Sequence, residues 1–545
     1  MHMEILLIRD FPPNTSQKMI ISSTEAFYAI LHFFFSNQVL LRRRGNRESV
    51  AMEALLRWGA ELGISDSPLC STPRSPPSSC LGHSLVVSHF PQAGGRGLAA
   101  ARDLRKGELV LRVPRAALLT SDSVLGDEKI ASCVSKHPSL SSTQVLIVCL
   151  LAEVGKGKTS KWYPYLLQLP QDYNILANFT NIEIESLQVE DVIWVAEKAV
   201  HRAKSDWEEA IPLMKEMEFN PRLLKFKSWL WASATVSSRT LHIPWDNAGC
   251  LCPVGDLFNY AAPHVMMYED INESSLAELE LIEESYDSNT SYFEDCKHAT
   301  KKLDAEETDN SSQRLTDGGY DEDTASYCFY ARKRYRKGEQ VLLCYGTYTN
   351  LDLLEHYGFF LSDNPNEKAF IQLDTDICSM STWPGESMYI QPDGSPSFAL
   401  LCALRLWATP ANKRRSVGHL VHSGSSISVE NELVIMNWLA KKCFGILGRL
   451  PTTIKADNNL LTILDKFKSH ATCINLADLL SHKEELGRFF QAHGLQLEAV
   501  SHSELPIRVQ KSLERWILAV EWRCNYKKTL FKCVCYCQDV IDKIS

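Results

Sequence analysis

Short apolar runs with strand-like alternation occur at 84–114 and again at 331–343 of this 545-residue chain, and longer runs with helical spacing occur between them and beyond residue 395. The run SLVVSHF (84–90) predicts a strand, and the glycine-rich turn AGGRGL follows it. AAARDLRKGELVLRVP (99–114) then predicts two short strands that form a hairpin around a Lys-Gly-Glu turn. ARKRYRKGEQVLL repeats this pattern 231 residues later. We therefore expect a β-rich core whose strands are far apart in the sequence.

Helical spacing appears between the two Lys-Gly-Glu segments, at roughly 140–240, and again beyond residue 395. Two sets of apolar residues in the C-terminal part each keep one helix face: Leu460, Leu464 and Phe467, and then Val509, Leu513, Trp516 and Val520. The predicted fold class is α+β, with a β-rich module that carries a helical insert and an all-helical domain after it.

The predicted boundaries follow from changes in composition. Residues 1–50 are an extension expected to be disordered, and 51–83 hold a helix and a Pro/Ser linker. The β-rich module covers 84–362, with a helical insert at about 126–235 and a disordered acidic insert at about 265–325. The helical domain covers 380–525, and a C-terminal tail covers 526–545.

Charge and cysteine content limit the partners and the compartment. The net charge is −9, yet residues 269–323 hold 18 Asp and Glu against four Lys and Arg, so the remainder is near +5. That remainder has no basic stripe with interleaved aromatic residues, which argues against nucleic acid as a direct ligand. The apolar run AFYAILHFFF near the N-terminus is too short to span a bilayer, so no membrane partner is expected. Seventeen cysteines without a secretory signal favour reduced thiols inside the cell, in the cytoplasm or nucleus rather than the chloroplast, which stays an alternative.

Several common site types do not fit the motifs. AGGRGL leads into a strand, whereas a phosphate-binding glycine run must open a helix. The run CVCYC (533–537) has C-x-C-x-C spacing and no second pair nearby, so unligated thiols are favoured over zinc and no metal is expected. By contrast, Asp256, Asn259, Tyr345 and Tyr357 are hydrogen-bonding residues at the ends of apolar segments. They suit a lined pocket better than a hydrolytic site, because no acid–base pair stands beside a nucleophile.

Six segments occur in the order seen in one enzyme family. They are GGRGL, the first Lys-Gly-Glu turn, SKWYPYLLQLP, VSSR, DLFNY and CYGTYTNLDLLEHYGF. In this order they resemble SET-domain protein-lysine methyltransferases, in the branch typified by the Rubisco large-subunit methyltransferase. The resemblance covers about 84–362, and PDGSPSFALLCALRLW resembles the start of that branch's helical substrate-binding domain. It implies a knotted SET domain, with a strand threaded beneath a closing loop, that moves a methyl group from S-adenosylmethionine to a lysine of a protein substrate.

The resemblance also implies roles for individual residues. A cofactor turn would be made by Gly94, Gly95, Arg96 and Gly97, and Arg239 would meet the methionine carboxylate. Asp256 and Asn259 would support the cofactor amine and the neighbouring backbone. Tyr345 matches the catalytic tyrosine, which also borders the cofactor, and Tyr357 matches the second aromatic wall.

One position departs from the family pattern. The family usually has Asn-His where this chain has Asn259-Tyr260, although the second residue of the pair contacts adenine mainly through its backbone. Two alternatives therefore accompany the lysine methyltransferase interpretation: a scaffold without methyl transfer that binds protein partners, and a protein-histidine methyltransferase. The expected substrate is a non-histone protein, and the expected oligomeric state is a monomer.

Overall fold

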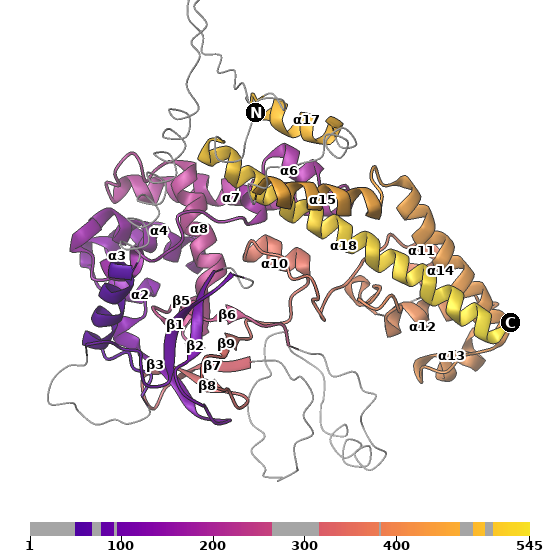
Figure 1. Cartoon of the computed structure of the whole chain (residues 1–545), viewed down its shortest axis with the longest axis horizontal. Helices are drawn as coiled ribbons and strands as arrows, with labels where there is room; N and C mark the ends of the chain where they lie inside the picture. Colours follow the sequence, from indigo (N-terminus) through magenta and orange to yellow (C-terminus); the bar gives the residue numbers. More distant parts are fainter. Residues whose placement is uncertain are drawn as a thin grey trace, which may run out of the picture.

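The structure is a computed structural model that describes residues 49–67, 78–91, 95–263, 315–380, 383–468, 483–495 and 505–545. A β-rich part flanked by helices is followed by a helical part built along one long helix (Figure 1). The predicted α+β class, with an all-helical C-terminal domain, is confirmed. Nearly all of the predicted N-terminal extension, most of the Pro/Ser linker and most of the acidic insert lie outside the described residues.

The main sheet has the strand order β1-β2-β9-β7-β8-β3, and β6 also pairs with β9 in parallel. Its strands are β1 (Leu85–Phe90), β2 (Gly95–Ala100), β3 (Leu109–Pro114), β6 (Asn259–Tyr260), β7 (Leu315–Asp321), β8 (Ser326–Ala331) and β9 (Gln340–Leu343). A separate hairpin joins β4 (Thr240–Ile243) to β5 (Asp246–Leu251). Strand β7 lies inside the segment predicted to be a disordered acidic insert, so that insert ends before residue 315 rather than near 325.

The two Lys-Gly-Glu segments form strands, as predicted, but not two separate hairpins. Strand β2 pairs with β9 and β3 pairs with β8, so each segment pairs with the other. The contacts repeat with the same 231-residue offset: Ala100 N–H donates to Glu339 O, and Ala331 N–H donates to Glu108 O, both at 2.9 Å. The turn sequences set the direction of each chain reversal, whereas burial of both apolar strand faces selects the distant partner.

The predicted helical insert is confirmed between β3 and β4. Its helices are α2 (Ser121–Leu125), α3 (Glu128–Ser135), α4 (Ser142–Lys156), α5 (Tyr163–Leu166), α6 (Asn181–Glu185), α7 (Glu190–Glu216) and α8 (Phe226–Arg239). Helix α4 is apolar on nearly every face and is buried in the core that it shares with the sheet. Helix α8 ends at Arg239 and passes directly into β4, which fixes the position of that arginine.

The C-terminal part is helical, as predicted. After α10 (Asn350–His356) it contains α11 (Thr375–Cys378), α12 (Phe398–Trp407), α13 (Arg414–His422), α14 (Val429–Arg449), α15 (Ile454–Lys468), α17 (Lys483–Ala492) and α18 (Ile507–Ile544). Residues 526–545, predicted to be a tail, are the second half of α18, because Leu530, Cys533 and Cys537 are fully buried against neighbouring helices. Among the described residues, no helix combines the length and apolar character needed to cross a membrane.

Buried charges join the helical domain to the insert. Arg515 of α18 pairs with Glu183 of α6 at 3.0 Å, and both side chains are nearly inaccessible to solvent. Asp457 of α15 accepts from Arg523 and Lys527 of α18, the latter at 2.6 Å. Arg523 and Lys527 also donate to Ser186 O and Gln188 Oε1 of the insert, both at 2.9 Å, so this buried set joins the two parts. Removing one member would leave an uncompensated charge.

Candidate functional site

Strands β6 and β9 bring the two candidate motifs of the sequence together. Asn259 and Tyr260 run parallel to the end of β9, and the chain then continues to Tyr345. The Tyr345 hydroxyl donates a hydrogen bond to the carbonyl oxygen of Phe258, and the Tyr260 hydroxyl donates to Gly346 O at 2.9 Å. The segments 258–260 and 345–346 are therefore joined by two hydrogen bonds, one donated from each segment.

The glycine-rich strand β2 closes the site from the other side. The Asn259 Nδ2 group donates to Arg96 O at 3.3 Å, and a Cβ atom placed on Gly97 would lie 2.5 Å from that same nitrogen. Gly97 is thus the residue that lets Asn259 approach the backbone of β2. Gly95 has a φ of +103°, a conformation that favours glycine. Gly94 lies outside the described residues.

Aromatic rings surround the Tyr345 side chain. The Tyr345 and Tyr357 rings stack with centroids 5.4 Å apart, and Tyr260 approaches Tyr345 at 5.3 Å. Tyr348, which the sequence analysis did not assign, lies 5.3 Å from Tyr357, and Phe359 lies 5.9 Å from Tyr260. The two expected tyrosines were noted at the ends of apolar segments, and the family resemblance gave their roles; Tyr348 could have been noticed as the aromatic residue within the same Gly-Thr-Tyr loop.

Both expected catalytic phenols remain protonated near neutral pH. Burial raises the pKa of Tyr345 above its ordinary value, although the neighbouring Arg239 opposes this. Burial also raises the pKa of Tyr357, and the hydrogen-bonded Tyr348 raises it further. A neutral phenol that donates to a carbonyl, as Tyr345 does, still presents its oxygen as an acceptor to a second group.

Arg239 and Asp256 form an ion pair beside this aromatic cluster. Arg239 Nη1 lies 3.0 Å from Asp256 Oδ2 and also donates to Asp256 O at 3.1 Å. Tyr165 donates to the same carboxylate at 2.8 Å. Burial by itself lowers the pKa of Arg239, but Asp256 and the tyrosines Tyr173 and Tyr165 raise it on balance, so the guanidinium stays charged. Asp256 therefore binds protein groups directly, in keeping with a supporting role.

The Arg96 side chain leaves the turn and binds the helical insert. Its Nη1 donates to Gln168 Oε1 at 2.7 Å, and its Nη2 donates to Gln168 O at 3.0 Å. The segment SKWYPYLLQLP, which supplies both Gln168 and Tyr165, thus anchors two parts of the site. The sequence analysis noted this segment without assigning roles to its residues.

The described residues retain donors and space suited to a ligand with an anionic end. Arg239 Nε and Gln340 Nε2 are buried and have no hydrogen-bond partner in the described part of the chain. Gln340 lies on β9 beside Gly97, where a Cβ atom would come within 3.0 Å of its nitrogen. A charged arginine with one unused N–H can bind a carboxylate, and the bare glycine strand allows close approach to the backbone. These residues fit an amino-acid-bearing cofactor such as S-adenosylmethionine.

Comparison with known proteins agrees with this geometry. Residues 95–346 match the SET domain family, and residues 351–484 match the Rubisco LSMT substrate-binding family. The chain is 48% identical over 503 residues to Protein SET DOMAIN GROUP 40 of Arabidopsis thaliana, covering 91% of this chain and 97% of that protein.

More distant relatives extend the comparison. The chain is 24% identical to an actin-histidine N-methyltransferase of Xenopus tropicalis, over 79% of this chain and 68% of that protein. It is also similar to the crystal structure of the SET domain of LSMT bound to lysine and AdoHcy, with a TM-score of 0.50 and 17% identity over 91% of this chain and 93% of that one. At that identity the likeness shows the fold. The chain therefore belongs to the SET-domain methyltransferase family that carries a Rubisco LSMT substrate-binding domain.

Proposed function

We propose that this protein transfers a methyl group from S-adenosylmethionine to a lysine side chain of a non-histone protein. One observation carries the proposal: the Tyr345 hydroxyl binds Phe258 O, next to Asn259, which itself reaches the glycine strand at Arg96 O. The LSMT structure that shares this fold is bound to lysine and AdoHcy, the demethylated form of the cofactor.

The cofactor would supply an electrophilic methyl group on a sulfonium. For this chain, Arg239 would hold the carboxylate end with its unused Nε–H, and Asp256 would keep that guanidinium oriented. Gly95 and Gly97 would allow the backbone of β2 to approach, and Asn259 would fix that backbone through Arg96 O. None of these roles needs a metal ion or a covalent enzyme intermediate.

The aromatic cluster would prepare the accepting amine. A free lysine has a pKa near ~10.4, so only about one in a thousand is neutral near pH 7. Rings of Tyr345, Tyr357, Tyr348 and Tyr260 remove water from the amine and so disfavour its charged form. The Tyr345 oxygen and the Phe258 carbonyl would orient the nitrogen, since both can accept hydrogen bonds.

A histidine acceptor is the second candidate, because a relative that aligns with 79% of this chain is named an actin-histidine N-methyltransferase. An imidazole is largely neutral near pH 7 and needs no desolvation to react. The cluster of four tyrosine rings that includes Tyr345 therefore favours a lysine, whose charge has to be suppressed. A scaffold without methyl transfer is disfavoured because Tyr260 donates to Gly346 O and supports the Tyr345 loop rather than disrupting it.

We further propose that the protein acts as a monomer in the cytoplasm or nucleus. Every described cysteine is a free thiol, as expected in a reducing compartment. Light scattering of the purified protein tests the first statement, and imaging of a tagged chain tests the second, with chloroplast signal as the contrary result.

The decisive experiment measures transfer of radioactive methyl groups from labelled S-adenosylmethionine into extract proteins. Mass spectrometry of the labelled peptide then identifies the methylated residue. Tyr345→Phe should lower turnover about a hundredfold while calorimetric binding of S-adenosylhomocysteine is kept. Tyr330→Phe, on an exposed position of β8, is the matched control and should change neither. Methyl-histidine in the product would replace the lysine assignment, and unchanged turnover in Tyr345→Phe would remove Tyr345 from the chemistry.

A further inference from the structure

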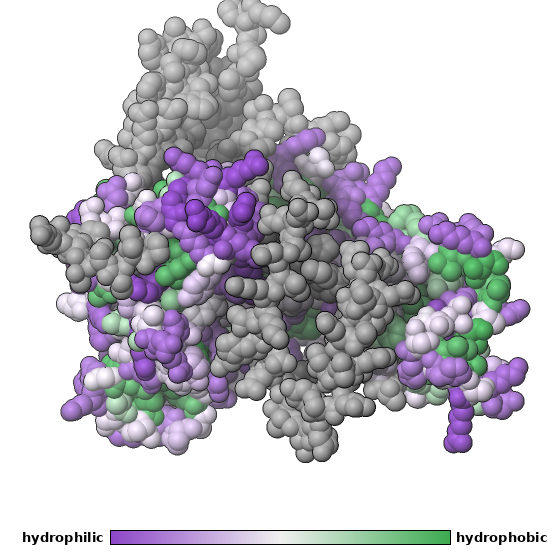
Figure 2. All heavy atoms as spheres, turned by 90° about the horizontal axis from the view of Figure 1, so that it is seen from below, coloured by the Kyte–Doolittle hydropathy of each residue, from purple (hydrophilic) through white to green (hydrophobic). Residues whose placement is uncertain are grey.

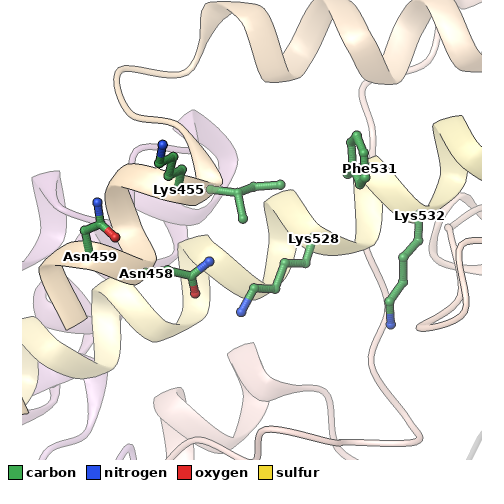
Figure 3. A pocket seen from close by; sticks show the side chains of 7 residues that line it. Lys455, Asn458, Asn459, Lys528, Phe531 and Lys532 are labelled. Carbon is green, nitrogen blue, oxygen red and sulfur yellow. The ribbon is translucent and has the colours of Figure 1, made fainter. Parts of the chain in front are cut away.

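A groove lies on the helical domain, apart from the aromatic cluster. It has a volume of about 550 Å³ and runs between the start of α15 and the second half of α18 (Figure 3). The residues that line it are Ile454, Lys455, Asn458, Asn459, Lys528, Phe531 and Lys532. Neither family resemblance nor the site described above assigns a role to these side chains.

The groove is positively charged, because three of its seven lining residues are lysines and none is acidic. Within the described part of the chain, Lys455 and Lys528 have no carboxylate partner, and Lys532 donates to Pro392 O at 2.9 Å. Two other lysines of the same domain do have carboxylate partners: Lys442 pairs with Asp374, and Lys511 pairs with Glu514. Unpaired like charges around one hollow attract a negatively charged partner.

An apolar contact surface lies among these charges. The Phe531 side chain is 53% exposed although it sits in the middle of a long helix, and Ile454 lines the groove with it. Figure 2 shows that apolar side chains reach the surface over the helical C-terminal part of the molecule. Exposed aromatic residues beside cations are typical anchor points of protein–protein contacts. The groove thus suits a segment that has both carboxylates and an apolar side chain.

The lysines of α18 lie on the face that leads toward the candidate active site. Asn525, Lys528 and Lys532 are three and four residues apart and share one side of the helix. Asn525 donates to Glu367 at 3.3 Å, and Glu367 also accepts from Asn350, the first residue of α10. Helix α10 is followed directly by Tyr357. Lys528 and Lys532 therefore lie on the side of α18 that is joined through Glu367 to α10, the helix that precedes Tyr357.

We propose that this groove docks an acidic segment of the protein substrate, with an apolar residue of that segment against Phe531. The proposal rests on the proposed function, because it names the chemistry of the substrate for the same site. It also explains why a non-histone protein is favoured, since a basic histone tail would be repelled by three lysines. Docking by the groove would contribute to substrate affinity and leave the methyl-transfer step unchanged.

The first test uses a fluorescein-labelled peptide, Glu-Asp-Leu-Glu-Asp-Phe, and its Gln/Asn counterpart as a neutral control, with anisotropy as the readout. The full-length protein should bind the acidic peptide at least tenfold more tightly than the neutral one, and added salt should weaken this binding. The double variant Lys455→Glu/Lys528→Glu should lose at least tenfold in affinity. Lys413→Glu/Lys441→Glu, which makes the same charge change at exposed sites outside the groove, should keep it. Equal effects of the two double variants would overturn the proposal.

The second test separates this proposal from the proposed function. In methyl transfer to the labelled extract protein, the groove variant should raise KM at least tenfold with kcat and S-adenosylhomocysteine binding unchanged. If the wild type transfers methyl groups and the variant has an unchanged KM, the docking role of the groove is refuted and the proposed function is kept. Absence of transfer by the wild type would refute the proposed function, while the peptide measurement would still test whether the groove binds acidic segments. A lowered KM in the variant would instead assign the groove to the chain's own acidic segment (269–323) and so overturn the proposal.

Discussion

Gly97→Ala should weaken cofactor binding, because the added Cβ atom would displace the Asn259 side chain. The added Cβ would lie 2.5 Å from Asn259 Nδ2, 3.0 Å from Gln340 Nε2 and 3.1 Å from Phe90 Cδ2. An unstrained contact needs about 3.4 Å, so the Asn259 amide would have to move by about 0.9 Å. That movement breaks its 3.3 Å hydrogen bond to Arg96 O.

The size of the effect follows from these contacts. A small-to-large change in a packed position costs about 1–3 kcal/mol, and a lost hydrogen bond costs about 0.5–1.5 kcal/mol. If about 1.4–2.8 kcal/mol of this appears in ligand binding, the affinity for S-adenosylhomocysteine falls about tenfold to a hundredfold. Gly97 does not need a positive φ, so the fold itself should survive the change.

Calorimetric titration with S-adenosylhomocysteine measures this loss, and circular dichroism checks that the fold is kept. Gly319→Ala is the matched control, because Gly319 lies on β7 of the same sheet and an added Cβ there meets nothing within 4 Å. The control should bind as the wild type does. Wild-type affinity in Gly97→Ala would show that the contact between Asn259 and the glycine strand has no part in binding the cofactor.

Three further predictions concern stability and helix α18. Burial is the largest cause that raises the pKa of Glu367, to about 7 from 4.5. The folded state therefore binds this proton more tightly, and the free energy of unfolding should fall by about 3 kcal/mol as pH rises from about 4.5 to 7. Glu367→Gln should remove that part of the pH dependence in urea titrations, and an unchanged profile would contradict the assignment. Asp457→Asn should lower the free energy of unfolding by about 3–5 kcal/mol, because the buried Lys527 loses its carboxylate and Arg523 keeps only Glu485. A loss below about 1 kcal/mol would argue against the buried network. Cys535 should react with a thiol reagent in the native protein far faster than Cys533 and Cys537, since only Cys535 of the three is exposed. Mass spectrometry after brief alkylation reads this out, and equal labelling would contradict a packed helix at residues 526–545.

Much of the site was predictable because its components are encoded locally. A glycine turn that leads into a strand needs only its own residues, and so does a tyrosine placed just after an apolar strand. Helix α10 is likewise capped by Thr349, whose side chain accepts a hydrogen bond from the Asp352 backbone N–H, so the position of Tyr357 at its end follows from nearby sequence. The acidic composition of 269–323 also separated that segment from the folded modules, although β7 begins within it.

The pairing of these components was decided only by the tertiary structure. Two identical Lys-Gly-Glu turns are compatible with two local hairpins, yet the strands pair across the chain, because that arrangement buries the apolar faces of both segments together. The same holds for Arg239: its partner Asp256, and Tyr165, which donates to that carboxylate, come from two other elements of the chain. Local sequence determined which groups could take part in chemistry, whereas long-range burial determined which of them meet, since each contact depends on the packing of segments that no short stretch of sequence contains.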